Sequence, residues 1–281
     1  MLNPPFTFFS PYGWIVVTNQ ISFSFLSYSY IGATLLAIAF GTFLFVKTKK
    51  LSSFYLLLLC ISFAIYSLLD FALWVPLKDL SSIIFSWSIE YIFSISFFIL
   101  SYWFLYSFIK EHDLPMWQKI LSASTLLPTF IIIATNFNVS AVSASVDIAL
   151  ENEVVANYHS LLELLFILLV IIFTVVEYQK ALDTVNKKKI ALAGTGVTAF
   201  LSAFFFAYGI INFVIAINLW GLASTSYIYN LSPYAILGMP ILLGFLGYLI
   251  AKYQAFDVRL IKSIVLIVIL MILLFVGLFF A

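Results

Sequence analysis

Eight long apolar runs divide the chain, and each approaches or exceeds the roughly 20 residues that an α-helix needs to cross a bilayer. They cover residues 26–46, 51–75, 83–109, 117–134, 158–176, 190–217, 231–251 and 264–281. Only 9% of the residues are charged and 64% are hydrophobic, whereas soluble domains carry about 25% charged residues. We therefore predict an all-α, polytopic membrane helix bundle with seven transmembrane helices plus a partial eighth.

The basic residues predict the orientation of this bundle. Twelve of the 13 Lys and Arg residues lie in or beside the connections that follow the first, third, fifth and seventh runs. They are Lys47, Lys49, Lys50, Lys110, Lys119, Lys180, Lys187, Lys188, Lys189, Lys252, Arg259 and Lys262. Because cytoplasmic loops are enriched in Lys and Arg, we expect the N-terminus outside, with only Lys78 in an outer loop.

The same pattern divides the chain into four parts. Residues 1–25 are uncharged, aromatic and rich in proline, which suits a segment lying at the outer membrane interface. Residues 26–253 form the seven-helix bundle, and residues 254–263 form a basic cytoplasmic connector. Residues 264–281 are only just long enough to span, so we expect the start of a truncated further helix.

Three carboxyl groups lie inside apolar runs: Asp70, Glu90 and Glu163. The helix rise of 1.5 Å per residue places each of them roughly 8–10 Å below the outer surface. A charge in lipid costs about 2.5–3.5 kcal/mol, so such groups face the bundle interior or a wet cavity. His159 lies four residues before Glu163, on the same helical face.

These residues predict an acidic, aromatic pocket that opens outward and accepts a cation, a proton or a small polar ligand. Its candidate ligand-binding residues are Asp70, Trp87, Glu90, Tyr91, His159 and Glu163. The alternative is that each acid is protonated or hydrogen-bonded to a neighbour, and that the aromatic side chains are ordinary core or interface residues. A metal site made of the His and the three acids has suitable ligand types, but the sequence gives no geometry, and we assign no metal and no cofactor.

Other motifs indicate packing rather than chemistry. The chain contains no HExxH, GxSxG, GxxxxGK[ST] or CxxC motif, so we predict no catalytic residues and no enzyme activity. "GTG" at residues 194–196 favours close packing of helices. Pro240, with Gly238 and Gly244, is a candidate hinge in the seventh helix, although such residues are also common in ordinary membrane helices.

Two stretches resemble the seven-helix N-terminal membrane region of bacterial sensor histidine kinases. "GMPILLGFLGYLIAKYQAFDVRLI", residues 238–261, is similar to the end of that region, where members of the family show a phrase close to "AFNIKLI". "WFLYSFIKEHDLPMWQKIL", residues 103–121, resembles the junction of the family's third and fourth helices. The pattern covers most of residues 30–281, but only these two stretches are specific.

The resemblance implies a membrane-embedded sensory input module of a two-component system in the bacterial cytoplasmic membrane. It implies as partners the lipid bilayer, downstream kinase domains or a partner kinase, and a second copy of the chain; nothing suggests nucleic acid. The chain has no phosphoacceptor histidine box and no ATP-binding box, so we expect a fragment that lacks the kinase domains. The alternative is a small cation- or proton-coupled transporter. No acid continues a path through the inner half of the bundle, and no inverted repeat is visible.

Overall fold

The computed structural model describes residues 7–10, 13–16, 23–74, 80–135, 137–143, 148–206 and 232–253. Its helices are α1 Phe23–Thr48, α2 Leu51–Trp74, α3 Leu80–Lys110, α4 Met116–Ser124, α5 Leu126–Ala134, α6 Glu153–Lys180, α7 Thr184–Phe204, the 3-10 helix η3 Ser232–Leu237 and α10 Gly238–Tyr253. Four short strands complete the described structure: β1 Thr7–Ser10, β2 Gly13–Val16, β3 Val139–Ser143 and β4 Ile148–Glu151.

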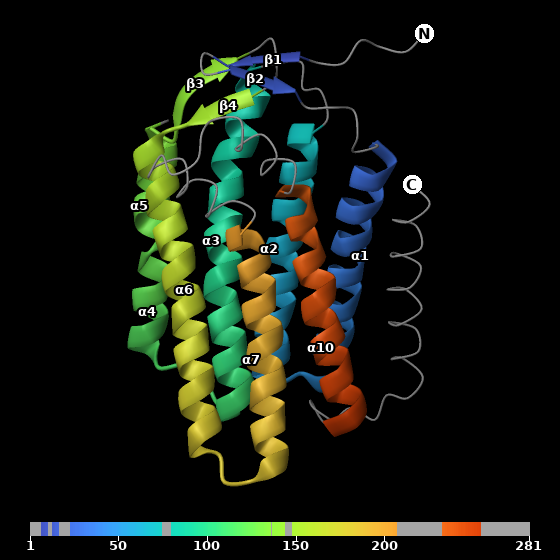
Figure 1. The fold of residues 1–281 in the computed structure, drawn as a ribbon. Helices are drawn as coiled ribbons and strands as arrows, with labels where there is room; N and C mark the ends of the chain where they lie inside the picture. The colour runs from blue at the N-terminus through green and yellow to red at the C-terminus, as the bar shows by residue number, and fades with distance from the viewer. Residues whose placement is uncertain are drawn as a thin grey trace.

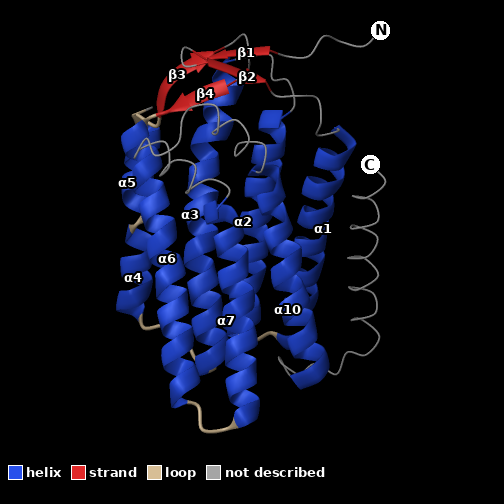
Figure 2. Ribbon diagram, in the orientation of Figure 1, coloured by secondary structure: helices blue, strands red, loops and turns tan. Residues whose placement is uncertain are grey.

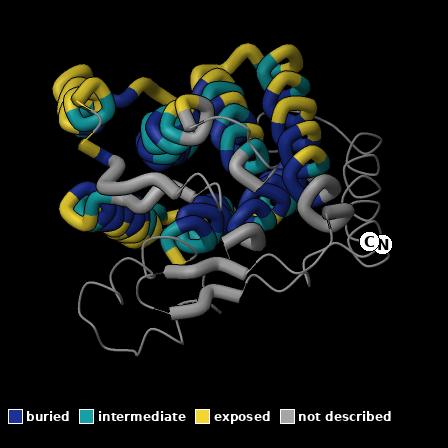
Figure 3. Tube along the Cα trace, turned by 90° about the horizontal axis from the view of Figure 1, so that it is seen from above, coloured by how far each residue is buried: buried dark blue, intermediate teal, exposed yellow. Residues whose placement is uncertain are grey.

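The long helices form a closed bundle (Figure 1). Around it, α2 packs between α1 and α3, α3 packs on α6, α6 on α7, and α7 on α10, which closes the ring against α1. The α4–α5 pair lies beside α3, and Figure 2 shows that helices dominate the described structure. Figure 3, seen from above, shows buried residues facing the bundle centre and exposed residues facing outward.

The described helices identify a multi-pass membrane protein. Five segments are long and apolar enough to cross a bilayer: Ser29–Thr48, Leu51–Ala72, Ile84–Lys110, Met116–Ala134 and Glu153–Lys180. A shorter apolar helix, Ala235–Ile250, lies in the same bundle. Large hydrophobic side chains on the outer surface, such as those of α6, are what a bilayer solvates. The first five apolar runs therefore coincide with candidate spans. The sixth and seventh runs contain α7 and α10, whose described residues are not long and apolar enough to count as spans, so seven spans stay a prediction. The predicted eighth helix and the connector at 254–263 lie outside the described residues.

Helices α6 and α7 begin five and six residues before their apolar runs, because polar side chains cap them. Asn152 accepts a hydrogen bond from the backbone N–H of Val154 at the start of α6. Asp183 accepts hydrogen bonds from the backbone N–H groups of Val185 and Asn186 at the start of α7. Such caps satisfy N–H groups that the first helical turn leaves without partners. Both helices thus extend beyond the hydrophobic core of the bundle.

The fourth predicted helix, 117–134, is instead two helices that meet at Thr125. Pro128 lies in the first turn of α5, where its missing N–H cannot bond back to the preceding turn. The Thr125 hydroxyl donates a hydrogen bond to the carbonyl oxygen of Ser122 at the break. The proline therefore divides a run that hydrophobicity alone joins.

Two antiparallel hairpins cover one end of the bundle (Figure 1). In the first, Thr7 pairs with Val16 and Ser10 with Gly13. In the second, Val139 pairs with Glu151, and the register shifts by the next pair. The all-α prediction did not include these strands, which formed part of the expected interfacial segment and of an outer loop.

Aromatic rings fill the middle of the bundle. Phe97 of α3 lies 4.8 Å from Phe204 of α7, and Tyr66 of α2 lies 5.4 Å from each of them, between ring centroids. Phe63 and Phe200 extend the same group, with centroids 6.1 Å apart. All five side chains are buried. We call Phe63, Tyr66, Phe97, Phe200 and Phe204 the aromatic core.

Candidate functional site

Helices α3 and α6 run in parallel (Figure 1). Near the hairpin end of the bundle they contact each other through polar side chains. The Tyr91 ring of α3 stacks on the His159 ring of α6, with centroids 4.1 Å apart and an angle of 28°. One turn further along, the Ser94 hydroxyl donates a hydrogen bond of 3.3 Å to Oε1 of Glu163. Three of the predicted site residues therefore lie in one contact between two helices.

His159 is held from a third helix as well. Its Nε2 lies 3.2 Å from the hydroxyl of Thr129 in α5, and the side chain is only 4% exposed. The neighbouring Tyr158 hydroxyl donates to the backbone carbonyl of Thr125, which ties α6 to the α4–α5 break. Within the described part of the chain, Nδ1 of His159 has no hydrogen-bond partner.

We call Tyr91, Ser94, Thr129, His159 and Glu163 the α3–α5–α6 cluster. The sequence predicted Tyr91, His159 and Glu163, but it missed Ser94 and Thr129. The spacing offered a signal for Ser94, which lies three residues after Tyr91 and therefore on the same face of α3. No comparable signal marks Thr129, because only the tertiary structure brings α5 against α6.

Glu90 is buried on α3 beside this cluster. It precedes Ser94 by four residues, so the two side chains lie on the same helical face. Glu90 and Glu163 each follow the first residue of their helix by ten positions, about 15 Å along the axis. They lie deeper along the helices than expected, since α3 and α6 begin before their apolar runs. Trp87 is half-buried one turn above Tyr91.

Asp70 belongs to a separate polar contact between α1 and α2. The Tyr30 hydroxyl donates a buried hydrogen bond of 2.8 Å to Oδ2 of Asp70. Beside it, Thr34 donates to the Ser67 hydroxyl, which in turn donates to the Tyr30 carbonyl oxygen. The sequence did not predict Tyr30 as a partner. A buried carboxyl held by a neighbouring hydroxyl is the alternative weighed above for each acid.

No metal centre emerges from these residues. Among the residues that the structure describes, no three His, Cys, Asp or Glu side chains are grouped so that they could hold a metal ion. The metal alternative for His159, Glu163, Asp70 and Glu90 therefore gains no support. What the α3–α5–α6 cluster offers is an imidazole, a carboxyl and hydroxyls in a buried site, which are groups that bind protons or donate and accept hydrogen bonds.

The candidate hinge residues lie where η3 becomes α10. Pro240 is buried in the first turn of α10, a position where a proline breaks no helical hydrogen bond. Gly238 is packed against α7: a Cβ there would lie 2.9 Å from the Ala203 Cβ and 3.1 Å from the Phe200 carbonyl oxygen. Gly244 is half-buried further along the helix. The hinge remains a prediction, but its place is a helix start rather than a mid-helix kink.

The opposite end of the bundle is held by ion pairs. Nζ of Lys110 in α3 lies 2.6 Å from Oε2 of the buried Glu177 in α6, and Nζ of Lys180 lies 3.1 Å from Oε1 of the same carboxyl. Asp113 lies in the α3–α4 connection, and its Oδ2 is 2.6 Å from Nζ of Lys119 in α4. The Tyr55 hydroxyl of α2 donates a hydrogen bond to the same carboxyl. These contacts join α2, α3, α4 and α6 on the basic side.

Partial burial by itself would raise the pKa of the Asp113 carboxyl. Hydrogen bonds from the Lys119 ammonium, the Tyr55 hydroxyl and the Leu114 N–H, together with the charge of Lys119, outweigh that effect. They hold the pKa of Asp113 below its ordinary value. Asp113 is therefore an ionised anchor of the α3–α4 connection, far from the α3–α5–α6 cluster.

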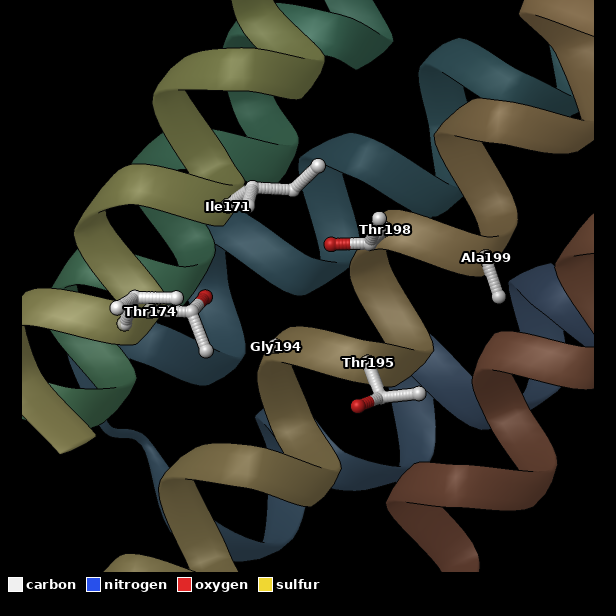
Figure 4. A pocket seen from close by; sticks show the side chains of 7 residues that line it. Ile171, Thr174, Gly194, Thr195, Thr198 and Ala199 are labelled. Atoms are coloured by element: carbon white, nitrogen blue, oxygen red, sulfur yellow. The ribbon is translucent and has the colours of Figure 1, made fainter.

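An apolar groove separates α6 from α7 on the outer surface (Figure 4). Its lining residues are Ile171, Thr174, Val175, Gly194, Thr195, Thr198 and Ala199. Gly194 forms the closest approach, because an added Cβ would overlap the Thr174 side chain. This contact confirms the prediction that the "GTG" stretch allows close helix packing. The groove carries no ionisable group, so it offers apolar contact and no acid–base chemistry.

Comparisons of the chain with protein-family models, with curated proteins and with solved structures found no match.

Proposed function

We propose that the chain is the membrane-embedded sensory input module of a bacterial two-component histidine kinase. In this proposal seven helices and the start of an eighth cross the cytoplasmic membrane, the N-terminus lies outside, and the hairpins face outward. The resemblance of residues 238–261 and 103–121 motivates the family. Support for the orientation comes from the described lysines, all of which lie at the ends of helices away from the hairpins.

The observation that carries the proposal is the one-sided placement of the buried acids. Asp70, Glu90 and Glu163 lie in the half of the bundle next to the hairpins, whereas the buried Glu177 at the other end is held by two lysines. The aromatic core fills the bundle between the two ends. A polar site closed off by a packed apolar core suits the reception of a signal, not the passage of a solute.

The contacts between helices supply a route by which a change at the cluster reaches the output. Helix α6 packs closely on α7 where Gly194 meets Thr174, and α7 packs on α10 where a Cβ on Gly196 would lie 2.8 Å from the Phe245 Cβ. Packed helix pairs respond by switching between discrete arrangements. A ligand that binds the two arrangements with different affinities shifts their populations, and α10 leads directly into the 254–263 connector.

A kinase fusion tests the proposal. Residues 1–263 are joined to the cytoplasmic domains of a histidine kinase, and autophosphorylation is measured in membranes while outer pH, ions and lipid composition are varied. Glu163→Gln should change the response because it alters the buried cluster. Glu153→Gln, on the exposed first turn of the same helix, should leave it unchanged. The sensory role would be contradicted if the kinase activity of the fusion stayed constant under all conditions and both variants matched the unmodified chain.

A second candidate is a proton- or cation-coupled transporter, which the two buried carboxyls near the α3–α6 contact favour. Proteoliposomes separate the two functions, because a sensor sustains no flux. Proton or cation uptake that Glu163→Gln abolishes and Glu153→Gln preserves would support transport and contradict the sensor proposal.

A further inference from the structure

We infer that the stimulus-binding group of the α3–α5–α6 cluster is His159, and that the ligand it takes up is a proton from the hairpin side. The inference deepens the proposed function, on which it rests for its meaning as a signal. Proton uptake itself is a property of the isolated protein and is measured without any kinase.

The hydrogen bonds of His159 define which tautomer the packing accepts. Nε2 lies within hydrogen-bond distance of the Thr129 hydroxyl, and Nδ1 has no partner among the described residues. Buried N–H donors without an acceptor are rarer in proteins than buried acceptors without a donor. The described packing therefore fits a neutral imidazole that carries its proton on Nε2 and leaves Nδ1 as the open basic site.

Protonation changes what this contact requires. A proton bound at Nδ1 creates a second N–H donor and a positive charge, while Nε2–H keeps Thr129. The stacked Tyr91 ring stabilises a positively charged imidazole. It lies against the face of the His159 ring, however, so it cannot accept a strong hydrogen bond from the Nδ1–H, which points outward in the plane of that ring. The charged imidazole thus needs a hydrogen-bond acceptor for its Nδ1–H, and in the described packing no acceptor lies within hydrogen-bond distance of Nδ1.

The groups around His159 supply such an acceptor only if the helices shift. From α6 the titratable neighbours are Tyr158, whose ring lies 5.4 Å away, and Glu163, one turn along the same face. From α3 they are Tyr91, in the stack, and the adjacent Glu90; α5 contributes the neutral Thr129. Every lysine that the structure describes lies at the opposite end of the bundle. A carboxylate is therefore the natural partner of the new donor, and reaching it changes the α3–α6 packing.

The chain offers a direct measurement, because it contains only two histidines, His112 and His159. In the His112→Gln variant of the full chain, reconstituted in zwitterionic nanodiscs with ¹⁵N-labelled histidine, every imidazole signal comes from His159. We expect the Nε2–H tautomer at high pH and a single reversible transition to the imidazolium as the pH falls from 9 to 3. The His159→Gln variant, which retains the exposed His112, serves as the solvated reference.

The coupling is measured on the same preparation with one spin label on each helix. Phe85→Cys on α3 and Leu161→Cys on α6 place the labels on exposed positions, with Cys60→Ala as background. The distance between labels should change at the same pH as the imidazole signal. Glu163→Gln should move that transition to a proton concentration at least about tenfold higher, since it removes the carboxylate acceptor.

Two results would overturn the inference. One is a His159 that stays neutral across the whole pH range in the otherwise intact cluster. The other is an imidazolium that forms while the label distance stays constant. A normal transition together with a pH-insensitive kinase fusion would leave proton binding in place and contradict the sensory role instead.

Discussion

At the scale of single residues, small side chains set how closely the helices approach. Gly194 touches Thr174 of α6, and Gly196, two residues later, touches Phe245 of α10. These two glycines on α7 thus allow close contact with two different helices, α6 and α10. Membrane helices rely on such close contacts because lipid provides no hydrophobic force that drives apolar helices together.

Gly194→Ala should destabilise the bundle by about 1–3 kcal/mol, the usual cost of overpacking, because the new Cβ overlaps the Thr174 side chain. The matched control is Gly247→Ala in α10, where no atom beyond the adjacent part of the helix lies within 4 Å of the added Cβ. That change should stabilise the bundle by about 0.5–1 kcal/mol, since alanine favours a helix more than glycine does. Thermal unfolding in detergent compares them, and equal midpoints for the two variants would contradict the described α6–α7 contact.

At the scale of elements, short polar anchors hold the connections that apolar packing leaves loose. Asp113 joins the α3–α4 connection to α2 and α4 through Tyr55 and Lys119. Lys119 also lies 5.4 Å from the centre of the Tyr55 ring, so one ammonium group contacts both a carboxylate and an aromatic face. The connection is therefore built from charge and ring contacts rather than from a regular turn.

The lowered pKa of Asp113 predicts a pH effect on the stability of the protein whose sign is fixed. Its contribution to stability is present above the ordinary carboxyl pKa of about 3.9 and is lost as the pH falls through the lower folded value. Because this side chain is 48% exposed, we expect at most about 1 kcal/mol. Asp113→Asn should lower the unfolding midpoint at pH 7 and leave it nearly unchanged near pH 3.

Asp183→Asn is the control for that experiment, because asparagine caps a helix as well as aspartate does. Its unfolding midpoint should match the unmodified chain at pH 7. If Asp113→Asn behaved in the same way at pH 7, the anchoring role of Asp113 would be refuted.

At the scale of the whole molecule, the bundle has two chemically different ends. The hairpins and the buried acids Glu90 and Glu163 lie toward one end, and the lysines lie at the other. The positive-inside rule predicts that the lysine end faces the cytoplasm, and on the proposed orientation we expect the α3–α5–α6 cluster to be reached from outside.

Two single-cysteine variants in a Cys60→Ala background test this orientation. Val154→Cys, 69% exposed at the start of α6, should react with a membrane-impermeant maleimide in intact spheroplasts. Leu182→Cys, fully exposed just after the same helix, should react only after lysis. The reverse labelling pattern would invert the bundle and place the cluster on the cytoplasmic side.

The apolar runs predicted where the long helices lie because a helix needs roughly 20 apolar residues to cross the bilayer. The bounds of the helices differed from the runs where a local polar contact or a proline decided them. Asn152 and Asp183 extended two helices beyond their apolar runs, and Pro128 divided a third. The hairpins were also missed, since short strands stabilised by the end of a bundle leave little pattern of their own.

For the candidate site, too, the sequence predicted one part and the packing of the helices decided the other. Hydrophobicity alone marks Asp70, Glu90 and Glu163 as residues that must turn inward, since lipid does not solvate a carboxyl. Which of them share a site is a matter of how the helices pack. Asp70 meets Tyr30 between α1 and α2, whereas Glu163 and His159 meet Ser94, Tyr91 and Thr129.

The sequence by itself determined the membrane class, most of the helices and the clustering of basic residues, because each follows from properties counted along the chain. Only the tertiary structure decided the partners of the buried acids and the environment of His159. Those partners come from helices far apart in sequence, and their meeting depends on side-chain packing that no local pattern records.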